Sequence, residues 1–185
     1  GELLDMFRES FDPQGFLDER HQKERFEVGC QALTKFYNSP KTRDAKPRYI
    51  EKEFSFMYGN NKISGRFDRV DIEGDGGAVI IDFKTSEINR QEDADRRVKE
   101  NSQLILYSLA YQKISGELPK RVELHFLERD LVGAAIVKES DISKILEKID
   151  LVSGGIRKQD FNPTPSYRNC RYCAYSQICP YAELK

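Results

Sequence analysis

Two strand-like segments joined by a turn constrain this chain more than any other feature. They are residues 65–71 (GRFDRVD) and residues 79–85 (VIIDFKT), and between them lies the turn-forming run EGDGG at residues 73–77. Such a run between two segments of alternating or apolar residues is typical of a β-hairpin. The sequence therefore predicts two paired strands near the centre of a sheet.

The second strand carries charges that an apolar strand does not need for folding. Because side chains alternate across a strand, Asp82 and Lys84 share one face, and Ile81 and Phe83 share the other. Burying such charges costs free energy unless they have partners or a function. If Asp68 of the first strand converges on the same face, two carboxylates and an ammonium meet. That set can hold Mg²⁺ beside a phosphate, whereas the alternative is a surface hairpin with solvated charges.

Four sequence blocks in order resemble the PD-(D/E)XK nuclease superfamily, specifically its RecB/AddB-like branch. The resemblance covers about the last two-thirds of the chain. The matching residues are Gly65, Asp68, Arg69 and Asp71 (G-x-x-D-R-x-D), Asp82 and Lys84 (D-x-K), Gln103 and Tyr107 (Q-x-x-x-Y), and Cys170, Cys173 and Cys179.

The resemblance implies an α/β fold with a restriction-endonuclease-like core, in which helices flank a central mixed β-sheet and a Cys-rich tail follows. It implies Mg²⁺- or Mn²⁺-dependent hydrolysis of DNA phosphodiesters, by an exonuclease or an endonuclease, in DNA repair or recombination. The resemblance also implies a helicase partner of the UvrD/Rep type, in cis or in trans. The alternatives are a non-catalytic DNA-binding module with a degenerate or truncated fold, and a zinc-stabilised interaction domain.

The same resemblance assigns roles to four residues. Asp68 and Asp82 bind the metal, Lys84 positions or activates the attacking water, and Gln103 lies near the lysine or the DNA backbone. Gln103 and Tyr107 stand four residues apart and so share a helix face. An amide gains little from burial alone, which favours a functional Gln103, whereas Tyr107 is equally consistent with packing.

Three further sets of polar residues have two readings. Glu53, with Glu51, could add a metal ligand or orient Lys84, or could lie on an exposed strand face. Arg69 and Asp71 are expected to form a structural ion pair. The two histidines are expected to lie outside the catalytic site: His21 on a solvated helix face, although RecB-like enzymes often carry a metal-binding histidine on an early helix, and His125 in the core or at a strand edge.

The cysteines form the most specific metal-binding pattern. Cys170-x₂-Cys173-x₅-Cys179, followed by proline, can hold a [4Fe–4S] cluster or zinc. The resemblance implies a [4Fe–4S] cluster in the full-length protein, with one more cysteine far upstream, and makes zinc the less favoured metal. Cys30 is the only other cysteine, but it lies on an apolar helix stripe where a buried thiol is ordinary. Cys30 is therefore either the fourth ligand of the cluster or a structural thiol of the helix.

Length and composition set broad limits. A chain of 185 residues fits one domain, with a helical lead-in at 1–48, a catalytic core at 49–137, and a helix and Cys-rich tail at 138–185. It begins without methionine and enters directly into helix-like sequence, which suggests a fragment of a longer protein. No apolar run approaches the about 20 residues of a membrane span, and no signal peptide is visible, so a cytoplasmic protein is expected.

The charge balance excludes one simple signature of a nucleic-acid-binding protein. Charged residues make up 33% of the chain, but the formal net charge is −1, so DNA contacts must come from local basic patches. Candidate patches lie at 41–48, 90–99 and 157–158. Hydrophobic periodicity predicts helices at 2–11, at 18–38, from 103 to near Gly116, and at 141–152, and further strands at 49–58, 121–127 and 134–137. The polar stretch 87–99 is expected to be disordered or helical, 41–48 a basic loop, and the tail from 161 a loop.

Overall fold

A computed structural model of the chain describes residues 1–39 and 46–183. These residues form two compact units, 1–145 and 146–185. The elements are α1 (Glu2–Ser10), α2 (Glu19–Asn38), β1 (Lys46–Tyr58), β2 (Asn61–Ile72), β3 (Ala78–Lys84), α4 (Gln91–Lys99), α5 (Ser102–Ser115), β4 (Arg121–Phe126), β5 (Leu131–Ala135), α6 (Glu139–Arg157) and α7 (Tyr167–Arg171).

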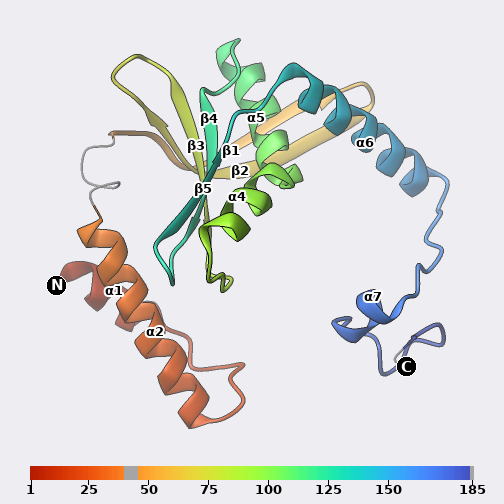
Figure 1. Ribbon diagram of the computed structural model, residues 1–185. Helices are drawn as coiled ribbons and strands as arrows, with labels where there is room; N and C mark the ends of the chain where they lie inside the picture. Colours follow the sequence, from red (N-terminus) through yellow and green to blue (C-terminus); the bar gives the residue numbers. More distant parts are fainter. Residues whose placement is uncertain (40–45, 184–185) are drawn as a thin grey trace. The chain divides into compact units, whose positions relative to one another are not determined.

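The first unit is built on one five-stranded sheet in the order β1-β2-β3-β4-β5. All neighbouring strands are antiparallel except β3 and β4, which are parallel. A parallel pair needs a crossover connection, and the chain makes it through α4 and α5 (Figure 1). The predicted fold class, a mixed sheet flanked by helices in a restriction-endonuclease-like α/β core, is confirmed.

The predicted central hairpin is present, and its two strands separate before the end of β3. The turn closes through a bond from the Glu73 N–H to the Gly77 carbonyl, with Gly76 at a φ of +84°. The β2–β3 ladder runs only as far as the Arg69–Ile81 pair. Beyond that point β2 continues to pair with β1 alone, as a long hairpin (Figure 1).

Helices α4 and α5 cover the face of the sheet to which Asp82 belongs. Phe67 is fully buried, and its ring packs against Tyr107 of α5 and Phe54 of β1, with centroids 5.5 and 4.7 Å away. On β5, Gly133 allows α4 to approach closely, because a Cβ at this position would lie 2.3 Å from the Ala94 carbonyl oxygen. The sheet and these helices therefore form one core that fixes where α5 begins.

The lead-in helices pack through aromatic rings. Phe7 of α1 stacks on Phe26 of α2 at 5.4 Å, and Phe11 approaches Phe26 edge-on at 5.0 Å. Near the end of α2, Phe36 meets the Phe83 ring of β3 edge-on at 5.5 Å. The predicted helices 2–11 and 18–38 are thus confirmed to within a residue or so, and Asp18 caps the second by accepting the His21 N–H.

Several predicted boundaries were wrong. β1 begins at Lys46 rather than Tyr49, so Lys46 and Arg48 lie in a strand and not in a basic loop, while Lys41 and Arg43 lie outside the described residues. The last strand spans Leu131–Ala135 rather than 134–137, because a tight turn with Asp130 at a φ of +52° pairs Leu131 directly with Phe126.

One helical segment matches a stated alternative, and two differ from expectation. The polar stretch at 87–99 is helical from Gln91, and α6 extends well beyond the predicted 141–152. In the tail, which was expected to be a loop, residues Tyr167–Arg171 form a short helix because Ser166 caps it by accepting the Asn169 N–H. Within the described residues, no helix is long and apolar enough to cross a membrane.

Candidate active site

Asp82 is a buried carboxylate in the middle of the sheet. It lies near the end of β3 and is only 1% exposed. The Lys84 ammonium is 2.5 Å from its Oδ2, but this oxygen accepts no hydrogen bond of normal geometry from the described residues. A buried carboxylate oxygen in this state retains lone pairs that can bind a further cation or donor.

Asp68 meets Asp82 at the point where β2 and β3 separate. Instead of a ladder bond, the Phe83 N–H donates to the Asp68 Oδ2 at 2.9 Å. The neighbouring Arg69 pairs with Ile81, so Asp68 lies beside Asp82 in the strand register. The end of the ladder therefore gathers the two carboxylates predicted from the sequence at one place.

The environment of Asp82 disfavours its negative charge in the absence of another cation. Burial raises the pKa of Asp82, the adjacent Lys84 lowers it, and the negative charge of Asp68 raises it further; the net direction is upward. A carboxyl group whose pKa is raised by desolvation and a like charge gains most from a bound cation. The electrostatics of the pair thus favour a metal ion.

Lys84 is held from the other side by α5. Its ammonium donates to the Gln103 Oε1 at 3.0 Å, and the Gln103 Nε2 donates to the Tyr107 hydroxyl at 2.9 Å. A lysine only donates hydrogen bonds, so the amide must present its oxygen to Lys84 and its nitrogen to Tyr107. Burial raises the pKa of Tyr107 and keeps this hydroxyl neutral. The structure thus links Asp82, Lys84, Gln103 and Tyr107 in a continuous chain of contacts.

Other residues named from the sequence lie apart from this chain. Arg69 Nε and Asp71 Oδ1 are 2.7 Å apart and form the expected structural ion pair. Glu51 pairs with Arg66 at 2.8 Å. Glu53 is exposed on β1 opposite Arg66, and no described contact joins it to the carboxylate pair.

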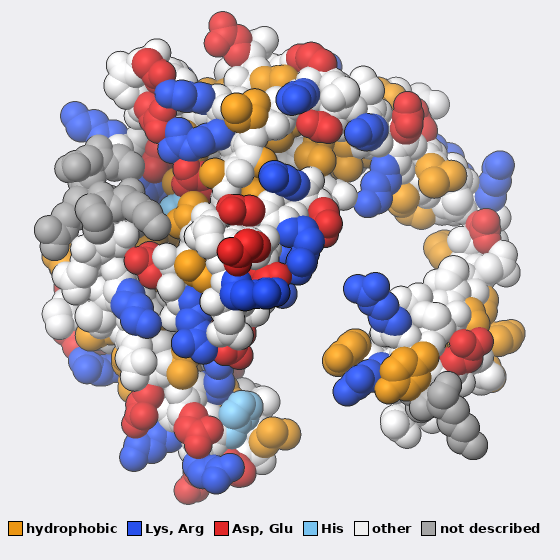
Figure 2. Space-filling model, in the orientation of Figure 1, with side chains coloured by type: hydrophobic (Ala, Val, Ile, Leu, Met, Phe, Trp, Pro, Cys, Tyr) orange, Lys and Arg blue, Asp and Glu red, His pale blue; other side chains and the backbone are white. Residues whose placement is uncertain are grey.

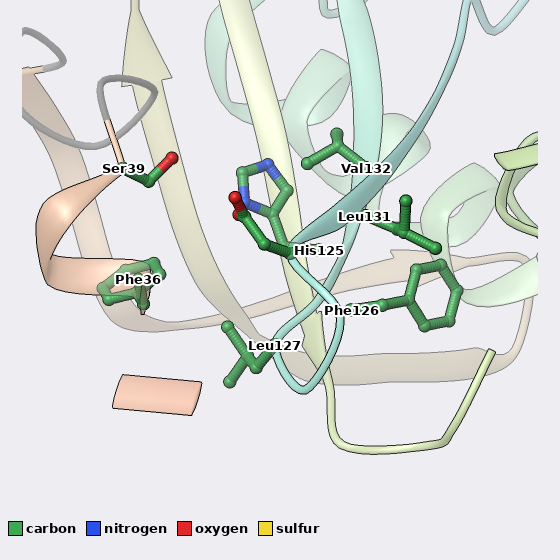
Figure 3. Close-up of a pocket in the computed structure, with 8 residues that line it drawn as sticks. Phe36, Ser39, His125, Phe126, Leu127, Leu131 and Val132 are labelled. Carbon is green, nitrogen blue, oxygen red and sulfur yellow. The ribbon is translucent and has the colours of Figure 1, made fainter. Parts of the chain in front are cut away.

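The far face of the sheet holds a polar cluster that sequence reasoning missed. On β4, Glu123 binds Arg121 at 2.6 Å and His125 at 2.7 Å. Burial raises the pKa of Glu123, but the hydrogen bonds from His125 and Arg121 outweigh it and hold the pKa below its usual range. Figure 3 shows His125 in a pocket with Ser39 and Val132 on either side. The alternation of Arg121, Glu123 and His125 in the sequence could have indicated this cluster, because residues two apart on a strand share one face.

The described residues contain no group of three or more His, Cys, Asp or Glu side chains arranged to hold a metal ion. Two carboxylates still suit Mg²⁺, which is commonly bound by one or two carboxylates together with water and substrate phosphates. Asp68 and Asp82 therefore fit such an ion, because the buried Asp82 Oδ2 lies beside Lys84 but accepts no hydrogen bond of normal geometry from the described residues.

The cysteines are free thiols with different surroundings. Cys170 is buried in α7, Cys173 is exposed in the turn after it, and Cys179 is partly exposed. The Cys173 N–H donates to the Cys170 carbonyl at 3.2 Å. Cys30 lies on α2 in the other unit and is partly exposed. The trio belongs to the unit 146–185, where backbone bonds order the loop that carries it.

Comparison with known proteins decides the family. A family model described as the PD-(D/E)XK nuclease superfamily matches residues 1–180. The chain belongs to the PD-(D/E)XK nuclease superfamily. Membership indicates nuclease activity, and nucleases of this superfamily bind DNA and typically use Mg²⁺ or Mn²⁺.

Comparison with individual proteins adds little detail. A solved structure described as the crystal structure of SSO0001 is similar, with 19% identity and a TM-score of 0.47, over 85% of this chain and 70% of that one. No curated protein matches the chain.

Metal binding should stabilise this PD-(D/E)XK protein in a pH-dependent way. Mn²⁺ at about 100 times its Kd should raise the free energy of unfolding by about 2.7 kcal/mol. Bound metal requires ionised Asp82, so the gain is complete above the raised pKa of Asp82 and is lost as the pH falls through it. The metal-induced stabilisation should therefore begin to fall at a higher pH than it would for an ordinary aspartate, whose pKa is about 3.9.

The measurement is thermal unfolding with and without Mn²⁺ from neutral to acidic pH. Asp82→Asn is the control and should show little metal-induced stabilisation at any pH. An equal stabilisation of the wild type and Asp82→Asn would contradict the assignment of Asp82 as a metal ligand.

Proposed function

We propose that this chain is a Mg²⁺-dependent deoxyribonuclease of the RecB/AddB-like branch, acting in DNA repair or recombination beside a helicase. The observation that carries the proposal is the contact chain from Asp82 through Lys84 to Gln103, next to Asp68. Surface charge does not oppose it: Figure 2 shows acidic and basic side chains interspersed, so DNA contacts depend on local groups.

The proposed roles follow from the positions of the groups. Asp68 and Asp82 would hold the metal, whose chemistry there would be to polarise the scissile phosphate and lower the pKa of a water molecule. Lys84 places its ammonium beside the carboxylates, where it orients the attacking water and stabilises negative charge that develops on the phosphate. Gln103 keeps Lys84 in place, and Tyr107 fixes the orientation of the Gln103 amide.

The test of this function is the hydrolysis of linear single-stranded and double-stranded DNA with Mg²⁺ or Mn²⁺, with a parallel reaction in EDTA. The expected result is cleavage that requires the metal. Comparing end-labelled with circular substrates separates an exonuclease from an endonuclease. DNA binding without cleavage under all of these conditions would instead favour a non-catalytic DNA-binding module.

We propose further that Cys170, Cys173 and Cys179 contribute three ligands to a [4Fe–4S] cluster. Their free thiols and their spacing support this assignment. Protein purified without oxygen should contain iron and sulfide in equal amounts and show the broad visible absorption of such a cluster. Cys173→Ser should lose both.

A variant of the remaining cysteine addresses the fourth ligand. If Cys30 completes the cluster, Cys30→Ser should also lose iron; if the ligand lies upstream in a longer chain, Cys30→Ser should behave like the wild type. Stoichiometric zinc in place of iron would overturn the iron–sulfur assignment and favour a zinc-stabilised tail.

A further inference from the structure

A pocket that contains both charged and apolar side chains lies directly beside Lys84. It is lined by Lys84 at the end of β3, by Ser86 in the loop that follows, by Arg97 of α4, and by Asn101 before α5, with Phe126 of β4 also contributing. Lys84 is therefore shared between this pocket and the carboxylate pair. If the scissile phosphate of a nucleic-acid backbone faces Lys84, an adjacent backbone phosphate would lie at this pocket.

Arg97 is held in a fixed position by two contacts. Its guanidinium donates to the Ser86 Oγ at 3.1 Å, and its Cζ lies 5.8 Å from the centre of the Phe126 ring. Phe126 is only 2% exposed, so the cation rests on part of the rigid core. The guanidinium is thus positioned before any ligand arrives.

Arg97 also differs from the other arginines near it. Arg90 and Arg96 both pair with Asp93, whereas no carboxylate among residues 1–39 and 46–183 lies within ion-pair distance of Arg97. A guanidinium has five N–H donors, and the bond to Ser86 uses one of them. Arg97 therefore offers a full positive charge and several donors to the pocket.

We propose that this pocket is a phosphate subsite, in which Arg97 and Ser86 bind a backbone phosphate next to the scissile one. The inference rests on the proposed nuclease function and assigns a substrate contact beyond the metal site. A guanidinium binds phosphate oxygens through paired, charge-assisted hydrogen bonds. The positive end of the α5 dipole, which Asn101 caps, adds to the field at the pocket.

One residue of the pocket opposes an anion and gives the inference a second, opposite test. Glu100 is exposed and also lines the pocket. Its carboxylate repels a bound phosphate, so it sets the affinity of the subsite below the value that Arg97 alone would give. Removing its charge should tighten the binding of DNA, whereas removing the charge of Arg97 should weaken it.

The experiment measures binding of a fluorescent single-stranded oligonucleotide by anisotropy in EDTA, where metal-dependent cleavage is prevented. Arg97→Gln should raise Kd by about 10-fold, the value of one charge-assisted contact, and should lower the slope of log K against log salt by about 0.7. Glu100→Gln should lower Kd. Arg96→Gln, on the same helix but paired with Asp93, is the matched control and should change Kd by less than about 2-fold.

The source of the phosphate is tested with 5′-phosphorylated and 5′-hydroxyl oligonucleotides. An equal effect of Arg97→Gln on both supports an internal phosphate, and an effect confined to the phosphorylated one would overturn it. If Arg97→Gln and Arg96→Gln bind the oligonucleotide with the same Kd, the assignment of the phosphate subsite is wrong, even if the wild type cleaves DNA. If the wild type fails to cleave DNA with metal but the Arg97 effect persists, the nuclease function fails and the phosphate contact stands.

Discussion

Asp82→Ala is expected to lower kcat/KM for DNA hydrolysis by at least about 10³-fold, to below the limit of most assays. The substitution removes the buried carboxylate that faces Lys84 and leaves Asp68 as the only aspartate at the end of the β2–β3 ladder. The proposed metal then loses one of its two carboxylate ligands, and the Lys84 ammonium loses its ion-pair partner. The measurement is initial rate against DNA concentration at saturating Mg²⁺.

The matched control for this variant is Asp75→Ala. Asp75 lies in the turn of the same hairpin, is exposed, and pairs with Lys120 at 2.6 Å, away from the carboxylate pair. Its loss should change kcat/KM by less than about 2-fold, because an exposed ion pair contributes little. Asp82→Ala cleaving DNA at the wild-type rate would remove Asp82 from the mechanism.

Asp82→Ala should affect catalysis without preventing folding. Burial raises the pKa of Asp82 despite the adjacent Lys84, so the ionised carboxylate does not favour the metal-free fold. The thermal unfolding of Asp82→Ala without metal should therefore show a folded protein with a cooperative transition. Binding of DNA in EDTA should also persist, since the phosphate contacts proposed for Arg97 are untouched.

The centre of the fold could be predicted because local sequence encodes it. Alternation in 79–85 places Asp82 and Lys84 on one face whatever the rest of the chain does, and the EGDGG turn pairs this strand with the one before it. The i,i+4 spacing of Gln103 and Tyr107 likewise places both on one side of α5, where the structure joins them by a hydrogen bond. These features depend on short-range geometry alone.

Features that depend on distant parts of the chain were not predicted. The point where β2 leaves β3 decides that Asp68 binds the Phe83 N–H, and only the register of both strands sets that point. The pocket around Arg97 needs α4 to dock on β5, which Gly133 permits by its close contact with Ala94.

Lys84→Ala is expected to lower kcat by about 10²- to 10³-fold, the range for removing one preorganised charge from a reaction centre. In contrast to Asp82→Ala, it should retain the Mn²⁺-induced stabilisation, because both carboxylates remain. Lys84→Arg should not restore the rate, since a planar guanidinium cannot occupy the place of a compact ammonium between Asp82 and Gln103.

The matched control for Lys84 is Lys120→Ala. Lys120 also pairs with carboxylates, those of Glu73 and Asp75, but at the turn of the hairpin, so its loss should leave kcat unchanged. Lys84→Ala with normal kcat and a raised KM would show that the ammonium binds DNA without assisting the reaction. A fall in kcat at retained metal binding instead assigns Lys84 to the chemical step, because the two proposed metal ligands, Asp68 and Asp82, are both still present in Lys84→Ala.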